Sequence, residues 1–201
     1  DSGCRPGYHC ATVPRYNEAE VRRGTCLPGE PPPVEPGNCM AQLDALGLNY
    51  TPAGNGQENP PGRPDLVCDI DTPIRLSSPI GGISYRYVAN ANSTPMYMSC
   101  HLALALHRLS EILRRYDIVE VGHIGTYNCR LIGGTNEISM HGLALAIDLK
   151  WFRASDGTVY DVEDHWEHDT ENFRTERGRV LYEMGRAMHD ERVFNIVLTP
   201  N

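Results

Sequence analysis

The chain has 201 residues, of which 40% are hydrophobic, and a formal net charge of −8. This length fits one main domain with a smaller appendage. The acidic balance disfavours a nucleic-acid groove or an anionic membrane surface as partner, since either would be repelled on average. No run of 18 apolar residues occurs, so the sequence predicts no transmembrane segment.

The N-terminal part of the chain is rich in cysteine and proline. Residues 1–30 contain Cys4, Cys10 and Cys26 and show no sustained apolar periodicity. Residues 31–38 are rich in proline, and successive prolines hold the backbone extended. We therefore expect a small Cys-rich segment over residues 1–30, a linker over 31–38 and the main domain over 39–201.

Within the main domain, the apolar spacing predicts the elements in turn. Residues 40–48 have the pattern of a short helix, residues 72–76 form an extended run, and residues 83–88 alternate as a strand. Over residues 99–116 leucines recur every three or four positions, which predicts a long amphipathic helix.

The second half of the domain mixes further strands with one more helix. We expect strands over residues 118–121, 143–151 and 194–198, and a helix over about 171–190. Helices interleaved with strands that are not adjacent in sequence indicate an α+β fold.

The seven cysteines predict disulfides. None of them forms a Cys-x-x-Cys pair, so the spacing is not that of a structural zinc site or a thioredoxin-like redox site. Disulfides persist in oxidising compartments, which favours a secreted, periplasmic or cell-surface protein. An odd count leaves one thiol over, and Cys4 is the candidate for a disulfide between chains.

Residues 139–148 carry the strongest indication of chemistry. Large and small side chains alternate from residue 143 onward, so a strand here would place Ala144, Ala146 and Asp148 on one face. His141 just before such a strand and Asp148 at its far end are donors that a catalytic zinc ion uses. The alternative is that Asp148 caps the strand and His141 is a polar loop residue.

The same ten residues resemble the Ser-x-His-x-x-Gly-x-Ala-x-Asp signature of zinc D-alanyl-D-alanine peptidases, whose fold is shared with hedgehog domains. Over roughly residues 39–201 the chain resembles the bacterial extensin-like C-terminal domain family. That resemblance rests on Tyr127-x-Cys129-Arg130, Ser139-x-His141, Asp148, Phe152-x-x-x-Asp156-Gly157 and Val197-Leu198-x-Pro200-Asn201. It implies a hedgehog/DD-peptidase-like fold, with a small, mainly antiparallel sheet packed against helices.

The resemblance also implies a function and a set of site residues. His141 and Asp148 would bind zinc, Arg130 would anchor an oxyanion or a substrate carboxylate, and Ser139 would support the ligand loop. The implied activity is that of a zinc peptidase acting on peptidoglycan peptide or another cell-envelope component. For Arg130 the alternative is a surface arginine beside a disulfide.

Two departures from the peptidase pattern concern the metal site. Residue 144 is alanine where the signature has glycine. The third zinc ligand of the family follows the Leu-x-Pro-Asn run, and here that position would lie beyond Asn201. We therefore expect either a domain truncated at its C-terminus or an incomplete metal site, and the latter predicts a non-catalytic binding or structural domain on the cell surface.

Two further expectations concern histidines and disulfide pairing. His165 and His168 have a spacing that can bind a metal, and the alternative is an acidic surface loop anchored by Trp166. From chain order and the family resemblance we expect the pairs Cys39–Cys68, Cys100–Cys129 and Cys10–Cys26.

Overall fold

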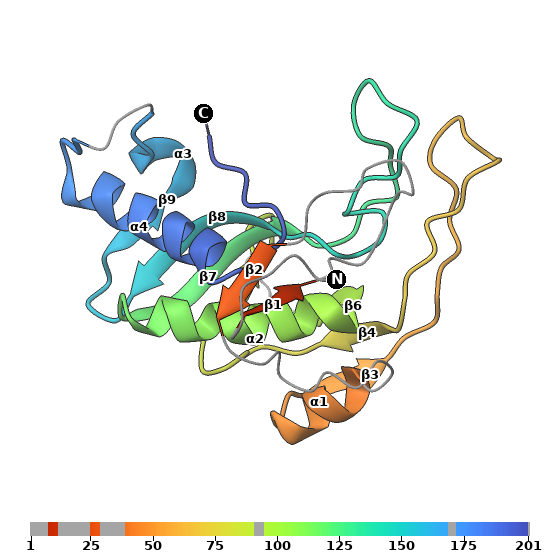
Figure 1. Ribbon diagram of the computed structural model, residues 1–201, viewed down its shortest axis with the longest axis horizontal. Coiled ribbons are helices and arrows are strands. Elements are labelled where there is room, and N and C mark those ends of the chain that lie inside the picture. The colour runs from red at the N-terminus through yellow and green to blue at the C-terminus, as the bar shows by residue number, and fades with distance from the viewer. Residues whose placement is uncertain (1–7, 12–24, 29–38, 91–94, 169–171, 201) are drawn as a thin grey trace. The chain divides into compact units, whose positions relative to one another are not determined.

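The computed structural model describes residues 8–11, 25–28, 39–90, 95–168 and 172–200 (Figure 1). The chain divides into two compact units, Asp1–Asn38 and Cys39–Asn201. None of the helices in the described ranges is long and apolar enough to cross a membrane.

In the first unit, β1 (Tyr8–Ala11) pairs with β2 (Thr25–Pro28) as an antiparallel hairpin. Cys10 stands directly opposite Cys26 in the register. Only the backbone is described here, so the Cys10–Cys26 disulfide stays a prediction. Cys4 and the predicted linker over residues 31–38 lie outside the described residues.

The second unit contains two sheets. One is antiparallel and three-stranded, with β3 (Tyr50–Pro52), β4 (Pro73–Leu76) and β6 (Met96–Ser99) in that order. The other has the order β5 (Ser84–Tyr87), β7 (Ile118–Gly125), β8 (Asp148–Ala154) and β9 (Val159–Asp161). In it β5 runs parallel to β7 and the other pairs are antiparallel, so the four-stranded sheet is mixed.

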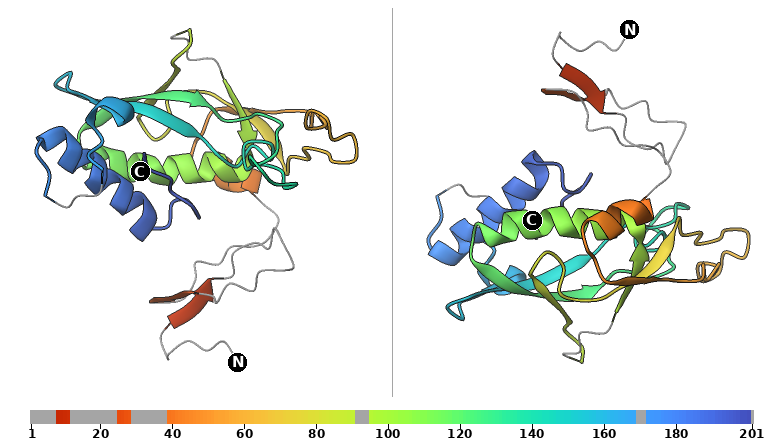
Figure 2. Two further views of the ribbon diagram at one scale, coloured as in Figure 1. Left: turned by 90° about the horizontal axis from the view of Figure 1, so that it is seen from above. Right: turned by 90° about the horizontal axis from the view of Figure 1, so that it is seen from below.

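Four helices accompany the sheets: α1 (Cys39–Ala45), α2 (Cys100–Arg114), α3 (Val162–His165) and α4 (Glu176–Asp190). α2 begins where the Ser99 hydroxyl accepts a hydrogen bond from the His101 backbone N–H, which caps the helix. Figure 2 shows α2 and α4 on one side of the four-stranded sheet. The apolar stripe that α2 buries there is made by Leu102, Leu106, Leu109, Ile112 and Leu113.

The architecture confirms the α+β expectation, and most predicted elements are present. The long helix and the strand over residues 83–88 are found as α2 and β5. The last helix starts later than expected, at Glu176, because the Thr175 side chain accepts a hydrogen bond from the Gly178 N–H and caps it there. Residues 194–198 form no strand.

The predicted strand over residues 143–151 is wrong in its first half. β8 starts only at Asp148, and residues 140–144 form a turn in which the Ala144 N–H donates to the His141 carbonyl at 3.2 Å. Ala144 is fully buried, with φ 51°, so it does not clear an open face for Asp148 as the alternation suggested. A left-handed residue breaks the two-residue period on which that prediction relied.

The expected disulfide pairs of this unit are also wrong. The structure joins Cys39 to Cys100 and Cys68 to Cys129, with Cα–Cα distances of 6.1 and 5.8 Å. Cys39 opens α1, which packs against α2, whereas Cys68 lies on a loop beside Cys129. Both bridges span 61 residues. Four cysteines allow three connectivities, and spacing alone does not choose among them.

Candidate functional site

His141 and Asp148 come together at the end of the four-stranded sheet. His141 lies on the loop over residues 126–147, and Asp148 opens β8 opposite Gly125 of β7. His141 Nε2 is 3.3 Å from Asp148 Oδ1. The His141 side chain is 12% exposed and that of Asp148 is 56% exposed. A nearly buried imidazole and an open carboxylate leave the pair accessible from one side.

The separation of the two atoms fits two corners of a zinc site. Ligand atoms at bond lengths of about 2.0–2.2 Å and tetrahedral angles lie about 3.3–3.6 Å apart. The same separation serves an ion pair when His141 is protonated. Among the described residues no group of three or more His, Cys, Asp or Glu side chains could hold a metal ion. The described residues therefore fit a metal through two donors and lack the third.

Ser139 fixes the backbone on which His141 stands. Its Oγ accepts a hydrogen bond from the His141 N–H at 3.3 Å, and its carbonyl accepts one from the Gly142 N–H at 2.8 Å. Its own N–H donates to the Arg130 carbonyl at 2.9 Å. The buried serine thus links the turn that carries His141 to the Arg130 segment.

Ala144 ties this turn to the start of α2. Its carbonyl accepts a hydrogen bond from the Ser99 N–H at 3.0 Å. Its positive φ lies in the region that favours glycine, which is the residue of the peptidase signature at this position. Compared with glycine, alanine at this position therefore adds about 1–2 kcal/mol of backbone strain.

A disulfide buttresses the same turn from the other side. A Cβ atom built on Gly142 would lie 3.1 Å from Cys68 Sγ and 2.7 Å from Ile138 Cγ2. The absence of a side chain at Gly142 is therefore what lets the Cys68–Cys129 bridge pack against the His141 turn. Both cysteines are buried.

Two long loops stand side by side at this end of the molecule (Figure 1). Besides the disulfide, the Tyr127 hydroxyl donates to Glu58 Oε2 at 3.1 Å, and Arg63 donates to Asn136 Oδ1 at 2.8 Å. Burial, and then the hydrogen bond to Glu58, raise the pKa of Tyr127 to about 12, so the phenol stays protonated at neutral pH. The loop over residues 53–72 thus braces the loop that carries His141.

Arg130 is exposed and follows Cys129 directly. Its side chain donates to the Leu131 carbonyl at 3.3 Å, and in the described part of the chain no carboxylate forms a salt bridge with it. The Arg130 carbonyl accepts a hydrogen bond from the Ser139 N–H, which keeps this residue beside the His141 turn. Its exposed guanidinium is therefore available to an anion that reaches that turn. Its predicted role stays a prediction.

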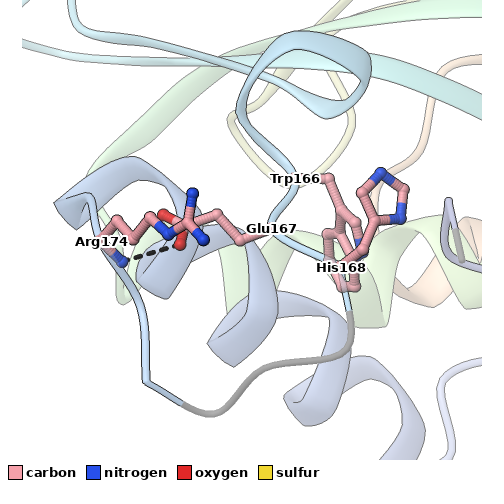
Figure 3. A pocket seen from close by; sticks show the side chains of 4 residues that line it. All are labelled: Trp166, Glu167, His168 and Arg174. Carbon is pink, nitrogen blue, oxygen red and sulfur yellow. Dashed lines mark hydrogen bonds between the residues drawn. The ribbon is translucent and has the colours of Figure 1, made fainter.

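His168 lines a pocket together with Trp166, Glu167 and Arg174 (Figure 3), whereas His165 is not among the lining residues. His165 Nδ1 accepts from the Asp161 N–H at 2.9 Å, and Arg177 lies 3.1 Å from its Nε2. The two histidines belong to no metal-donor group among the described residues.

The carboxylate in this pocket has a structural role. Glu167 accepts hydrogen bonds from the backbone N–H groups of Arg174 and Thr175, at 2.7 and 2.8 Å, just before α4. These bonds hold its pKa below the usual range. The Arg174 contact is the dashed line in Figure 3, where Glu167 extends away from His168. The pocket is thus built around the start of α4.

The pairing of His101 with Asp71 was not anticipated from the sequence. His101 Nε2 lies 3.3 Å from Asp71 Oδ2 at the start of α2. Both side chains are more than half exposed. No sequence motif joins these residues, because the packing of α2 against the segment before β4 brings them together.

The comparison with protein families agrees with the family resemblance. The family model described as extensin-like protein C-terminus matches residues 37–201. The search of curated proteins and the search of solved structures each find no match. Since the family model covers most of the chain, the protein belongs to the family of extensin-like protein C-terminal domains.

Proposed function

We propose that Cys39–Asn201 is a zinc-dependent, peptidase-like domain that acts outside the cytoplasm on cell-wall peptide. The observation that carries this proposal is the His141–Asp148 pair, whose donor atoms are 3.3 Å apart and whose carboxylate is open to solvent. The hedgehog/DD-peptidase-like fold is part of the proposal.

The chemistry of the site follows from its donors. His141 and Asp148 would hold the zinc ion, which would act as a Lewis acid and lower the pKa of a bound water to about 7. His141 is presented by a turn that Ser139 and the Cys68–Cys129 disulfide hold, so little reorganisation is needed to bind the ion. A third donor from outside the described residues would complete the set.

Arg130 supplies the substrate contact in this proposal. Peptidoglycan stem peptides carry free carboxylates, and a planar guanidinium binds a carboxylate through two parallel hydrogen bonds. The Ser139–Arg130 backbone bond keeps the segment that carries Arg130 beside the His141 turn. Arg130 would therefore orient the substrate rather than exchange protons, because its guanidinium stays charged.

The location proposed for the domain rests on its disulfides. The described residues include two bridges and no free cysteine. Such bridges form and persist in a periplasm, at a cell surface or in a secreted protein.

A non-catalytic, zinc-dependent binding domain is the second candidate function. It is favoured by the donor count, because two donors hold zinc weakly and catalytic zinc sites use three protein ligands. In this second candidate function, His141 and Asp148 bind a metal ion, and a binding partner supplies the remaining ligand.

The test is a zinc titration of the full chain and of two single variants, followed by an assay on peptidoglycan stem peptide. We expect one zinc per chain in the parent, and a loss of affinity of at least about tenfold in His141→Ala and in Asp148→Asn. His101→Ala is the matched control, because it removes a His–Asp pair of the same separation.

The outcomes separate the two candidates. Hydrolysis that is lost with the zinc supports the peptidase. Zinc binding without hydrolysis supports the binding domain, and unchanged zinc affinity in both site variants would overturn the proposed site.

A further inference from the structure

The four-stranded sheet carries a charged cluster on its more exposed face. α2 and α4 lie on the other side of the sheet (Figure 2). We define the sheet-face cluster as Arg86 on β5, Glu120 on β7, and Trp151 and Arg153 on β8. These side chains cross three adjacent strands.

Two arginines share one carboxylate in this cluster. Glu120 accepts a hydrogen bond from Arg86 Nε, and Arg153 Nε lies 2.9 Å from its other oxygen. The Glu120 side chain is only 14% exposed, whereas those of Arg86 and Arg153 are 50% and 46% exposed. Each guanidinium has five N–H donors, so one carboxylate leaves most of them for another anion. The cluster therefore has one positive charge in excess, on a chain with a net charge of −8.

The indole of Trp151 gives the cluster a flat surface. A Cβ atom on Gly122 would lie 2.2 Å from Trp151 Cε2, so the ring lies across the backbone of β7 where no side chain intervenes. Arg153 Cζ is 5.2 Å from the centre of this ring, and Arg86 stands opposite Gly122 in the register. The ring thus lies over β7 at the residue that stands opposite Arg86, and beside the Arg153 guanidinium.

Neighbouring charged residues limit the excess positive charge to the sheet-face cluster. On the β9 side, Lys150 Nζ is 3.3 Å from Asp161 Oδ1 and also bonds Glu163, so that lysine is fully matched by carboxylates. An anion is therefore favoured on the β5 and β7 side of Trp151 and disfavoured on the β9 side.

The cluster and the candidate metal pair lie along the same strand. Asp148 begins β8, Trp151 is three residues on and Arg153 five. The register of β8 against β7 shifts between Trp151 and Leu149 and again before Asp148, so at a rise of about 3.3 Å per residue these positions are at most roughly 10 and 17 Å from Asp148. An extended peptide of about three to five residues spans that distance.

We infer that the sheet-face cluster binds a second carboxylate of an acidic peptide whose other part occupies the His141–Asp148 pair. This inference rests on the proposed function and narrows its substrate to a peptide with at least two carboxylates. Arg86 and Arg153 hold the remote carboxylate, and Trp151 packs against the chain between the two sites.

Fluorescence of Trp151 provides the test. The chain has two tryptophans, so Trp166→Phe makes Trp151 the only one. The probe is the synthetic peptide L-Ala-γ-D-Glu-meso-diaminopimelate-D-Ala-D-Ala, titrated into this full chain. We expect a saturable change in emission and, in Arg86→Gln/Arg153→Gln, an affinity at least about tenfold lower. The same peptide with its Glu and diaminopimelate carboxyls amidated should bind the parent at the weaker level.

Two controls keep the result interpretable. Arg115→Gln removes an arginine that is 52% exposed and 2.6 Å from Glu191, and it should leave the affinity unchanged. If the double variant unfolds because Glu120 is left without a cation, adding Glu120→Gln removes that charge too, and the same tenfold loss is expected.

Peptide affinity within twofold of the parent in the folded arginine variants would overturn this inference, as would equal affinity for the amidated peptide. Zinc binding that depends on His141 would still stand in that case. Conversely, unchanged zinc affinity in His141→Ala overturns the proposed function, while the fluorescence titration still measures whether the sheet face binds the carboxylates.

Discussion

The His141–Asp148 and His101–Asp71 pairs have the same separation and different surroundings. In each pair Nε2 and a carboxylate oxygen are 3.3 Å apart. His141 is nearly buried, whereas the His101 and Asp71 side chains are 56% and 75% exposed. The His141 turn is held by Ser139 and a buried disulfide, whereas His101 is an exposed residue on the first turn of α2. Because the distance is the same in both pairs, the burial of His141 and the contacts that hold its turn are what distinguish the candidate site.

The largest expected effect comes from the disulfide behind the His141 turn. Replacing Cys68 and Cys129 by alanine should lower the free energy of unfolding by about 4 kcal/mol, because the bridge closes a loop of some 60 residues. It should also weaken zinc binding, since the turn loses its buttress. Chemical denaturation and zinc titration measure the two effects.

The other disulfide is a matched control for this prediction. Cys39–Cys100 spans the same 61 residues but joins α1 to α2. Removing it should cost a similar free energy of unfolding and leave the zinc affinity of the folded protein unchanged. Equal loss of zinc affinity in both double variants would show that the Cys68–Cys129 bridge has no special relation to the site.

Gly142→Ala should give a smaller effect at the same turn. The new methyl group would clash with Ile138 Cγ2 and approach Cys68 Sγ, so we expect a loss of about 1–3 kcal/mol in the free energy of unfolding. Gly133→Ala, on the same long loop, meets no heavy atom within 4 Å and should change stability by less than about 0.5 kcal/mol. Equal effects on the melting temperature would contradict the packing described here.

Ala144→Gly should have the smallest effect. Glycine relieves about 1–2 kcal/mol of left-handed strain, but it loses a buried methyl group and gains freedom in the unfolded chain, each worth about 1 kcal/mol. The free energy of unfolding should therefore change by less than about 1 kcal/mol. Ala144→Val keeps the strain and adds volume in a fully buried position, so a melting temperature equal to that of the glycine variant would refute the assigned backbone.

The sequence predicted the elements whose periodicity is regular and missed the places where the backbone departs from it. The leucine pattern of α2 predicted a buried stripe, and the stripe is there. The alternation after residue 143 suggested a strand, but Ala144 takes a left-handed conformation that the alternation itself does not reveal. In this conformation the Ala144 carbonyl accepts a tertiary hydrogen bond from the Ser99 N–H.

The candidate site was likewise predicted in part from the sequence. The motif around His141 and Asp148 predicted two residues that the fold does bring together. The disulfide pairs could not be predicted, because four cysteines allow three connectivities that spacing does not distinguish. The packing of α1 on α2 brings Cys39 to Cys100. The Glu58 contact with Tyr127 was also missed, since it depends on two loops far apart in sequence.

Anomalous X-ray scattering at the zinc edge, on crystals grown with zinc, would show directly whether His141 and Asp148 bind the metal. We expect one strong peak within about 2.0–2.2 Å of both His141 Nε2 and Asp148 Oδ1. A peak at His101 and Asp71, or at His165 and His168, with none at the His141 turn would contradict it.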